Sequence, residues 1–283
     1  METGQFAPPL GPEAYARCFA TFRSISNEWQ AMLKWSGEVL PGLLPAKEQL
    51  SILSVGSGTG EFDVEFARLL QAKFKSLQYV TIEPNLTECR QLQSRIAASH
   101  LDKIQFEIDP VAFENFPRQQ RFDLILFSHC LYYLPDRDQA LTQARDLLLG
   151  SGLLLIFHQT PQGIDQIQQR FMRRVKGDEN EMFTSREIQA ILEGHRLPYR
   201  LEVLESFLDV TSCFQPDSPT GRELLSFFLE SDVRQVRPEL QQEIVAYLKE
   251  ISFPNQERRL LYHPVAVFCL FAPKATVSPS QIA

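Results

Sequence analysis

A glycine-rich turn is the feature that most constrains how this chain can fold. The segment GSGTGE at residues 56–61 follows a short apolar run, SILSV at 51–55, and precedes a stretch with helical periodicity at 62–74. These patterns predict a buried strand, a tight loop and a helix. Glycines let the backbone lie against a ligand, and the start of a helix offers free N–H groups. The loop is therefore a candidate binding loop, although such a turn alone is also compatible with simple chain reversal.

Strands and helices alternate after this turn. Further apolar runs predict strands at 79–82, 104–108, 123–128, 153–158, 199–210 and 260–271. Between the first five strands, periodic stretches predict helices, among them 86–98 and 136–149. Near-continuous apolar strands separated by helices are typical of a parallel sheet covered on both faces. We therefore predict an α/β fold with a seven-stranded, mostly parallel sheet of the nucleotide-binding type.

Helical material flanks this sheet in the sequence. Aromatic and aliphatic side chains recur at helical spacing near the N-terminus, and residues 219–251 are largely helical in pattern. We expect these segments to form a helical cap. The predicted organisation is a cap segment at 1–50, an α/β core at 51–160, the remaining strands with an inserted helical cap at 161–272, and a tail at 273–283.

Charge and hydropathy exclude several classes of protein. Hydrophobic residues make up 44% of the 283 residues and charged residues 22%, as in globular proteins, and the net charge is −7. An acidic chain is not expected to bind nucleic acid, because the phosphates must be neutralised by cations. We interpret the short basic cluster around Arg173 and Arg174 as a solvated helix face. No apolar run is long enough to predict a membrane span. We expect a monomer that binds neither nucleic acid nor membrane.

The cysteines argue against structural cross-links. The five of them lie far apart in the sequence and form no C-x-x-C pair, so neither a disulfide framework nor a zinc site is expected. His158, His195 and His263 look isolated in the sequence, and we assign no metal ligands. Because the N-terminus also lacks the pattern of a secretory signal, the unpaired thiols indicate a reducing compartment, and we expect a cytoplasmic protein.

Polar side chains follow the predicted strands at their carboxyl ends. Glu83 ends the second strand, 23 residues after Gly60 (83 − 60), a spacing at which a carboxylate can meet a ribose diol in α/β nucleotide sites. Asp109 ends the third strand, where it can reach an adenine edge, and Ser128-His129 ends the fourth. Ligands bind at this edge of open α/β sheets. The alternative is that these carboxyls only serve loops or helix caps.

The glycine spacing narrows the nucleotide class. Glycines at 56, 58 and 60 match neither GxGxxG nor the phosphate loop that ends in GK[ST]. The spacing resembles the GxGxG loop of class I S-adenosylmethionine-dependent methyltransferases, a Rossmann-like family with acidic residues ending strands two and three and a reversed last strand. The resemblance implies S-adenosyl-L-methionine as the cofactor. The implied cofactor-binding residues are Gly56, Ser57, Gly58, Gly60, Glu83, Pro84, Asp109 and Ser128.

A narrower resemblance covers nearly the whole chain. The sequence is similar to the histamine N-methyltransferase family in an N-terminal aromatic helix, in ILSVGSGTGEFD at 52–63, in Leu131-Tyr132-Tyr133 and in DVTSCF at 209–214. In that family the N-terminal helix and inserted helices close over a small aromatic amine. The match implies that Glu28 contacts the substrate. The implied aromatic pocket residues are Tyr15, Phe19, Tyr132, Tyr133 and Phe228, each of which also suits ordinary core packing.

The chain departs from the family at polar substrate positions. His129 stands where the family has a substrate-binding glutamine, and Pro264, beside His263, stands where it has an asparagine. The family's pocket tryptophans fall near Ile164 and Gln168. A site that recognises its substrate through hydrogen bonds discriminates strongly between similar substrates. These changes can therefore alter which acceptor is methylated. His129 and His263 are the candidates to take over the lost contacts.

The sequence thus predicts a transferase that methylates a small molecule. We expect the acceptor to be a nitrogen of a histamine-like or other imidazole or aromatic amine. Glu28 and His129 are the predicted catalytic residues, since either could hold the substrate or accept its proton. O-, S- or C-methylation on the same scaffold, and a non-catalytic cofactor-binding module, are the alternatives.

Overall fold

The computed structural model describes residues 6–117, 119–177 and 183–272, so the predicted tail at 273–283 lies outside the described residues. The chain divides into two compact units, each built from three separate segments. The helical unit comprises Met1–Ala31, Gln159–Glu187 and Val203–Val265. The sheet unit comprises Met32–His158, Ile188–Glu202 and Ala266–Ala283. None of the described helices is long and apolar enough to cross a membrane.

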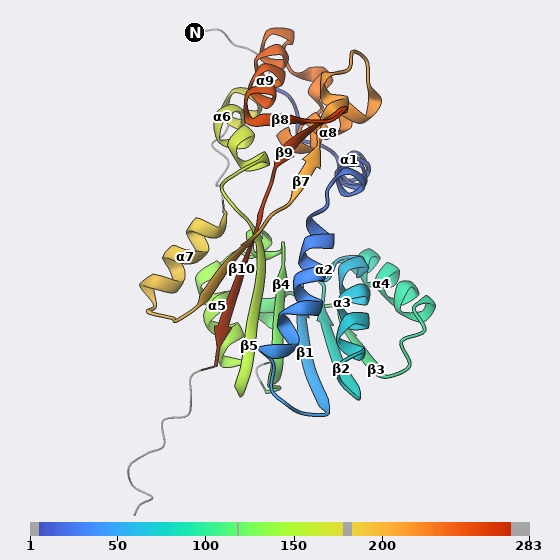
Figure 1. The fold of residues 1–283 in the computed structure, drawn as a ribbon, viewed down its shortest axis with the longest axis vertical. Helices are drawn as coiled ribbons and strands as arrows, with labels where there is room; N and C mark the ends of the chain where they lie inside the picture. Colours follow the sequence, from blue (N-terminus) through green and yellow to red (C-terminus); the bar gives the residue numbers. More distant parts are fainter. Residues whose placement is uncertain (1–5, 118, 178–182, 273–283) are drawn as a thin grey trace, which may run out of the picture. The chain divides into compact units, whose positions relative to one another are not determined.

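Seven strands form the large sheet in the order β3-β2-β1-β4-β5-β10-β6 (Figure 1). Their bounds are β1 Gln49–Val55, β2 Ser76–Ile82, β3 Ile104–Asp109, β4 Phe122–Ser128, β5 Leu148–Gln159, β6 Arg200–Leu204 and β10 Val265–Phe271. The first five pair in parallel. The N–H of Ala272, just after β10, donates to the carbonyl of Gly152 near the start of β5 at 2.9 Å, so β10 runs in the reverse direction. The predicted fold class is confirmed.

Helices cover the sheet because its strands are apolar on both sides. Six consecutive residues of β4 are buried, which requires cover on both faces. The helices of this part are α2 Glu28–Glu38, α3 Glu61–Gln71, α4 Leu86–Ala98, α5 Arg137–Asp146 and α7 Ser185–Gly194. Side-chain caps begin two of them: Asn85 accepts from the Thr87 N–H at 2.9 Å, and Asp136 accepts from the Gln139 N–H at 2.8 Å.

The helical unit has a core of its own. Its helices are α1 Pro12–Ile25, α6 Ile164–Lys176, α8 Pro219–Leu229 and α9 Pro238–Ile251. They pack around buried apolar side chains that include Phe171, Leu224, Phe228, Ile244 and Leu248. A second sheet, in the order β7-β9-β8, joins this unit, with β7 Phe207–Asp209, β8 Ser252–Asn255 and β9 Arg258–Tyr262. Short 3-10 helices complete the chain at Leu40–Gly42, Phe113–Asn115, Leu131–Tyr133, Thr211–Phe214 and Val233–Gln235.

Two long predicted strands are each divided between the two sheets. The stretch 199–210 becomes β6 and β7, and 260–271 becomes β9 and β10. The breaks coincide in space, since the His263 N–H donates to the Ser206 carbonyl at 2.9 Å and the Ser206 hydroxyl donates back to the His263 carbonyl. Pro264 follows directly and has no N–H to continue a ladder. The short strand β8 was not predicted, because its proline argues against a strand except at a sheet edge, where β8 lies.

The sheet unit contains a buried carboxyl that is not part of any predicted site. Asp63 on α3 is 3% exposed, and Oδ1 accepts a hydrogen bond from the Tyr79 hydroxyl of β2 at 2.9 Å. Burial raises the pKa of Asp63 to about 6, although hydrogen bonds from Ser54 and Tyr79 oppose the shift. The raised pKa means that the folded state disfavours the ionised form.

We predict that Asp63 makes the sheet unit less stable as the pH rises. The folded state holds the Asp63 proton more tightly than the unfolded state, so stability falls as the pH rises from the unfolded-state pKa to the folded-state pKa of about 6, and then stays constant. Asp63→Asn removes this dependence. Between about pH 4 and about pH 7, the free energy of unfolding of the wild type should fall relative to that of Asp63→Asn by roughly 2 kcal/mol, at 1.36 kcal/mol per pKa unit. Urea unfolding at the two pH values measures this. Asp102→Asn, at an exposed position, is the control; a pH-independent difference for Asp63→Asn would contradict the assignment.

Candidate functional site

The predicted binding loop joins β1 to α3 in a conformation that depends on glycine. Gly56, Gly58 and Gly60 have φ angles of +67°, +54° and +74°, a region that other residues enter only with strain. The N–H of Gly56 donates to the carbonyl of Ile82 at 2.8 Å, and the N–H of Ser57 does so at 3.3 Å. These bonds fix the loop against the end of β2.

Glu83 is held directly beside this loop. Its carboxylate accepts the Gly58 N–H at Oε2 and the Asn85 N–H at Oε1, each at 2.9 Å, and the residue is 6% exposed. A carboxylate oxygen can accept more than one hydrogen bond. Both oxygens therefore keep capacity for the paired hydroxyls of a ribose, and their direction is already fixed. This arrangement fits the predicted nucleotide site.

The other predicted cofactor residues lie at the carboxyl ends of neighbouring strands. The register pairs Val55 of β1 with Ile82, and Ile82 with Asp109 of β3. Ser128 ends β4, the strand on the other side of β1. Pro84 is exposed and follows Glu83. The strand order reverses between β1 and β4, which is the point where open α/β sheets bind ligands.

A histidine pair lies at the carboxyl ends of β4 and β5, with His129 directly after β4 and His158 next to the last residue of β5. His129 has a φ of +50°, and its N–H donates to the Phe157 carbonyl at 3.0 Å. The centroid of its ring is 6.3 Å from that of His158, which is fully buried. His158 is also 5.5 Å from the ring of Tyr132. Sequence reasoning treated His158 as isolated, yet the parallel pairing of Ser128 with Phe157 places His129 and His158 side by side.

Two adjacent tyrosines of the sheet unit differ in exposure. Tyr132 is half-buried, whereas Tyr133 is 68% exposed, and their ring centroids are 4.5 Å apart. The backbone carbonyl of Tyr132 accepts a hydrogen bond from Arg137 at 3.3 Å. The predicted residues of the sheet unit therefore gather at the carboxyl ends of its strands and in the loop that follows β4.

Glu28 begins α2 in the helical unit and is buried, with 4% of its surface exposed. Its Oε2 is 3.8 Å from Nε2 of His263, and its Oε1 is 3.6 Å from Nη1 of Arg23. Burial raises the pKa of Glu28, while the charges of His263 and Arg23 act to lower it. The structure thus joins two predicted residues, Glu28 and His263, and adds a third that the sequence did not single out, Arg23.

The aromatic side chains of α1 contact Phe227 of α8, whereas the predicted pocket residue on this helix was its neighbour Phe228. Phe227 stacks with its ring centroid 5.8 Å from those of Tyr15 and Phe19 and 4.6 Å from that of Phe22. Phe19 is 38% exposed, whereas Phe228 is fully buried in the core. On a helix, adjacent residues point in different directions, so Phe227 joins the aromatic cluster with α1 while Phe228 belongs to the buried core that also includes Phe22.

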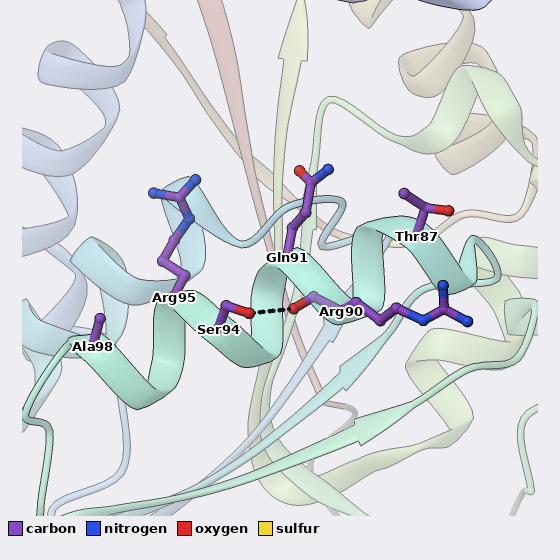
Figure 2. Close-up of a pocket in the computed structure, with 6 residues that line it drawn as sticks. All are labelled: Thr87, Arg90, Gln91, Ser94, Arg95 and Ala98. Atoms are coloured by element: carbon purple, nitrogen blue, oxygen red, sulfur yellow. Dashed lines mark hydrogen bonds between the residues drawn. The ribbon is translucent and has the colours of Figure 1, made fainter.

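The surface grooves of the chain lie elsewhere. A groove of about 550 Å³ follows the outer side of α4 (Figure 2) and is lined by Thr87, Arg90, Gln91, Ser94, Arg95 and Ala98. A second, of about 430 Å³, is lined by Pro161, Gln166, Gln169, Arg170, Arg186 and Tyr247. Neither contains a predicted site residue. Within the described ranges, no group of three or more histidine, cysteine or acidic side chains could hold a metal ion.

Comparison with known proteins identifies the family. A family model described as a methyltransferase domain matches residues 23–197, more than half of the chain. The chain belongs to the methyltransferase domain family. The matched residues of this methyltransferase include the glycine loop, Glu83 and the strand ends described above.

Curated relatives of the methyltransferase extend the similarity over most of its length. Histamine N-methyltransferase of Mus musculus is 26% identical over 269 residues, covering 88% of this chain and 91% of that protein. Carnosine N-methyltransferase 2 of Gallus gallus is 28% identical over 236 residues, covering 77% of this chain and 73% of that protein. The predicted resemblance to histamine N-methyltransferases is confirmed.

Solved structures show the same fold as this methyltransferase. The YcgJ protein of Bacillus subtilis superposes with a TM-score of 0.53 at 12% identity, covering 85% of this chain and 99% of that one. The plantazolicin methyltransferase BpumL, solved in complex with SAH, has a TM-score of 0.50 at 14% identity, covering 91% and 90%. At these identities the likeness concerns the fold alone.

We predict that Gly60→Ala destabilises the methyltransferase. Its φ of +74° is strained for alanine, and an added Cβ would overlap the side chain of Leu92, which is fully buried. The strain and the overlap together should lower the free energy of unfolding by about 2–4 kcal/mol, measured by urea unfolding. Gly194→Ala is the control, because no atom lies within 4 Å of an added Cβ there. Equal stability of the two variants would refute the loop conformation.

Proposed function

We propose that this methyltransferase transfers a methyl group from S-adenosyl-L-methionine to a nitrogen of a small imidazole or aromatic amine. The observation that carries the proposal is the Glu83 carboxylate, fixed by the Gly58 and Asn85 N–H groups at the reversal point of the sheet. The acceptor class is supported by the near full-length similarity to histamine and carnosine N-methyltransferases.

S-adenosyl-L-methionine is the cofactor, and when bound it supplies a methyl group on a sulfonium centre. Glu83 would accept hydrogen bonds from the ribose hydroxyls, and Asp109 would hold the adenine edge. The backbone of the glycine loop would lie along the cofactor, because glycines leave it free of side chains. The remaining cofactor contacts are assigned to Gly56, Ser57, Gly58, Gly60, Pro84 and Ser128.

The acceptor must present a free nitrogen lone pair. The N–C bond forms as the S–C bond breaks. A methylated imidazole would become neutral by losing the proton of its other ring nitrogen, and a methylated amine by losing a proton of the methylated nitrogen itself. Glu28 and His129 are assigned to hold the acceptor and receive that proton, since both imidazole and carboxylate act as general bases. The other acceptor contacts are assigned to Tyr15, Phe19, Tyr132, Tyr133, Phe228 and His263. Orientation and removal of water are the main contributions of these residues to the rate.

A second candidate is methylation of oxygen, sulfur or carbon on the same scaffold. The observation that favours it is the change of two polar positions, with His129 and Pro264 in place of the family's glutamine and asparagine. The site of methylation in the product separates the two. A non-catalytic cofactor-binding module is the third possibility and would give no product at all.

The cellular setting is part of the same proposal. All five cysteines are free and buried, as in a protein of a reducing compartment, so we place the enzyme in the cytoplasm. We propose that it acts as a monomer on a small molecule and binds neither nucleic acid nor membrane.

Release of S-adenosylhomocysteine from purified protein with a panel of small amines and imidazoles tests the function. We expect turnover with a nitrogen acceptor and a methyl group on nitrogen in the product. Glu28→Gln should lower turnover by about 10–100-fold, because it removes a charged partner of the acceptor, while cofactor affinity stays within about threefold. A Glu28→Gln variant that changes only cofactor affinity would disprove the acceptor role. No cofactor binding by the wild type would disprove the function.

We predict that Glu83→Ala abolishes most cofactor affinity. Two hydrogen bonds to a charged acceptor are worth about 3 kcal/mol together, which is about 100-fold in Kd. Calorimetric titration with S-adenosyl-L-methionine measures the loss. Glu65→Ala removes a carboxylate from the exposed side of α3, where it pairs with Arg68, and should bind the cofactor as the wild type does. Equal affinities of the two variants would show that the ribose contact is misplaced.

A further inference from the structure

A buried polar cluster lies at the base of the glycine loop. Asp63 is in the first turn of α3, and its Oδ1 accepts a hydrogen bond from the Tyr79 hydroxyl of β2 at 2.9 Å. The Ser54 hydroxyl of β1 also donates to the Asp63 carboxylate. All three side chains belong to buried residues. The cluster therefore connects β1, β2 and α3 within the sheet unit.

Two of these residues lie on either side of the glycine loop in the sequence. Ser54 comes two residues before Gly56, and Asp63 belongs to the helix that follows the loop. A hydrogen bond between Ser54 and Asp63 brings together the two ends of the segment that carries the glycines with positive φ. Tyr79 ties the same carboxylate to β2, which Glu83 directly follows. The cluster thus fixes the loop relative to Glu83.

A carboxylate is the side chain that suits this position chemically, although it is costly there. Burial raises the pKa of Asp63 to about 6, so its ionisation at neutral pH lowers the stability of the folded state. An amide of the same volume would avoid this cost. Its NH2 group, however, is a donor, and the two hydroxyls that face Asp63 also donate. Locally costly groups of this kind are expected at functional sites.

The groups that face Asp63 come from β2 and from the segment after β4. Besides burial, the charge of Glu83 acts to raise the pKa of Asp63. Burial also raises the pKa of the Tyr79 hydroxyl and that of the Cys130 thiol, so both keep their protons near neutral pH. Among Asp63, Tyr79 and Cys130, only Asp63 changes its charge between pH 5 and pH 7.

We propose that Asp63 is a positioning residue for the cofactor: through Ser54 and Tyr79, its carboxylate holds the glycine loop in the conformation that receives S-adenosyl-L-methionine. Protonation of Asp63 weakens this hold, because a carboxylic acid is a poorer hydrogen-bond acceptor than a carboxylate. Cofactor affinity therefore rises as Asp63 ionises. The inference rests on the proposed function, because it takes the loop and Glu83 as the cofactor site.

Asp63→Asn tests the role at constant side-chain volume. At pH 7, calorimetric titration with S-adenosyl-L-methionine should give a Kd about tenfold higher than that of the wild type, as for loss of one hydrogen bond to a charged group. Tyr79→Phe removes one donor to the carboxylate. It should raise Kd about threefold in the wild type and cause no further increase in Asp63→Asn. An unchanged Kd in Asp63→Asn would overturn the inference and leave the methyltransferase function standing.

Asp123→Asn is the matched control. Asp123 is also buried, and its Oδ2 accepts hydrogen bonds from the Ser51 N–H at 2.9 Å and from the Ser51 hydroxyl at 2.7 Å. This second pair of an aspartate with a serine of β1 lies in the same unit, but three residues further from the loop. Asp123→Asn should bind the cofactor as the wild type does. Urea unfolding midpoints show whether each variant is folded.

The pH dependence of Kd separates positioning from a merely structural role. Because the pKa of Asp63 is about 6 and the ionised form binds the cofactor more tightly, the wild-type Kd at pH 5 should be about tenfold that at pH 7. Asp63→Asn should lose this factor, whereas Asp123→Asn should keep it. The same pH dependence in wild type and Asp63→Asn would overturn the inference.

Hydrogen exchange of the loop decides the inference if the wild type does not bind S-adenosyl-L-methionine and the proposed function fails. The N–H of Gly56 donates to the Ile82 carbonyl at 2.8 Å, and that of Gly60 donates to the Ser57 carbonyl at 2.9 Å. Exchange of these two amides should be at least about tenfold faster in Asp63→Asn than in the wild type and unchanged in Asp123→Asn. In that case, equal exchange in the three proteins would overturn the inference.

Discussion

The hydrogen bond from the Gly58 N–H to the Glu83 carboxylate connects the local sequence to the architecture. It forms only if the loop adopts positive φ angles, if β1 and β2 end in register, and if the acidic residue directly follows β2. Each condition has its own origin in the sequence: glycines at alternate positions, two apolar strands of equal length, and a helix cap at Asn85 that fixes the chain after Glu83. The other residues of the predicted cofactor site lie around this bond at the strand ends.

The environment of the Glu28 carboxylate depends on the charged side chains that lie beside it. A buried carboxylate alone would be a natural counter-ion for an amine. Here Arg23 and His263 lie on either side of it, and both act to lower its pKa against the effect of burial. The surroundings of Glu28 therefore differ from those of a carboxylate that lies alone among apolar side chains.

The sequence could predict features that depend on neighbours along the chain. The glycine loop, the acidic strand ends and the sheet all follow from periodicity and spacing. Contacts between distant segments could not be obtained in this way. His158 looked isolated because its partner His129 is on another strand, Phe227 was passed over for Phe228, and Arg23 looked like an ordinary helix residue. The separation of β6 from β7 depends on Ser206 meeting His263, 57 residues later. The cofactor and acceptor contacts stay predictions until they are measured.

The position of β10 in the sheet determines when the chain can complete its folding during synthesis. Among the described strands it is the last in the sequence, yet it lies between β5 and β6 inside the large sheet. The segment just before it, up to Val265, also completes the helical unit. Neither unit can reach its final form until the ribosome has released these residues, and until then β5 exposes an unpaired apolar edge. Such an edge promotes association between nascent chains, so the yield of native enzyme in a cell should depend on chaperones that shield β5 during synthesis.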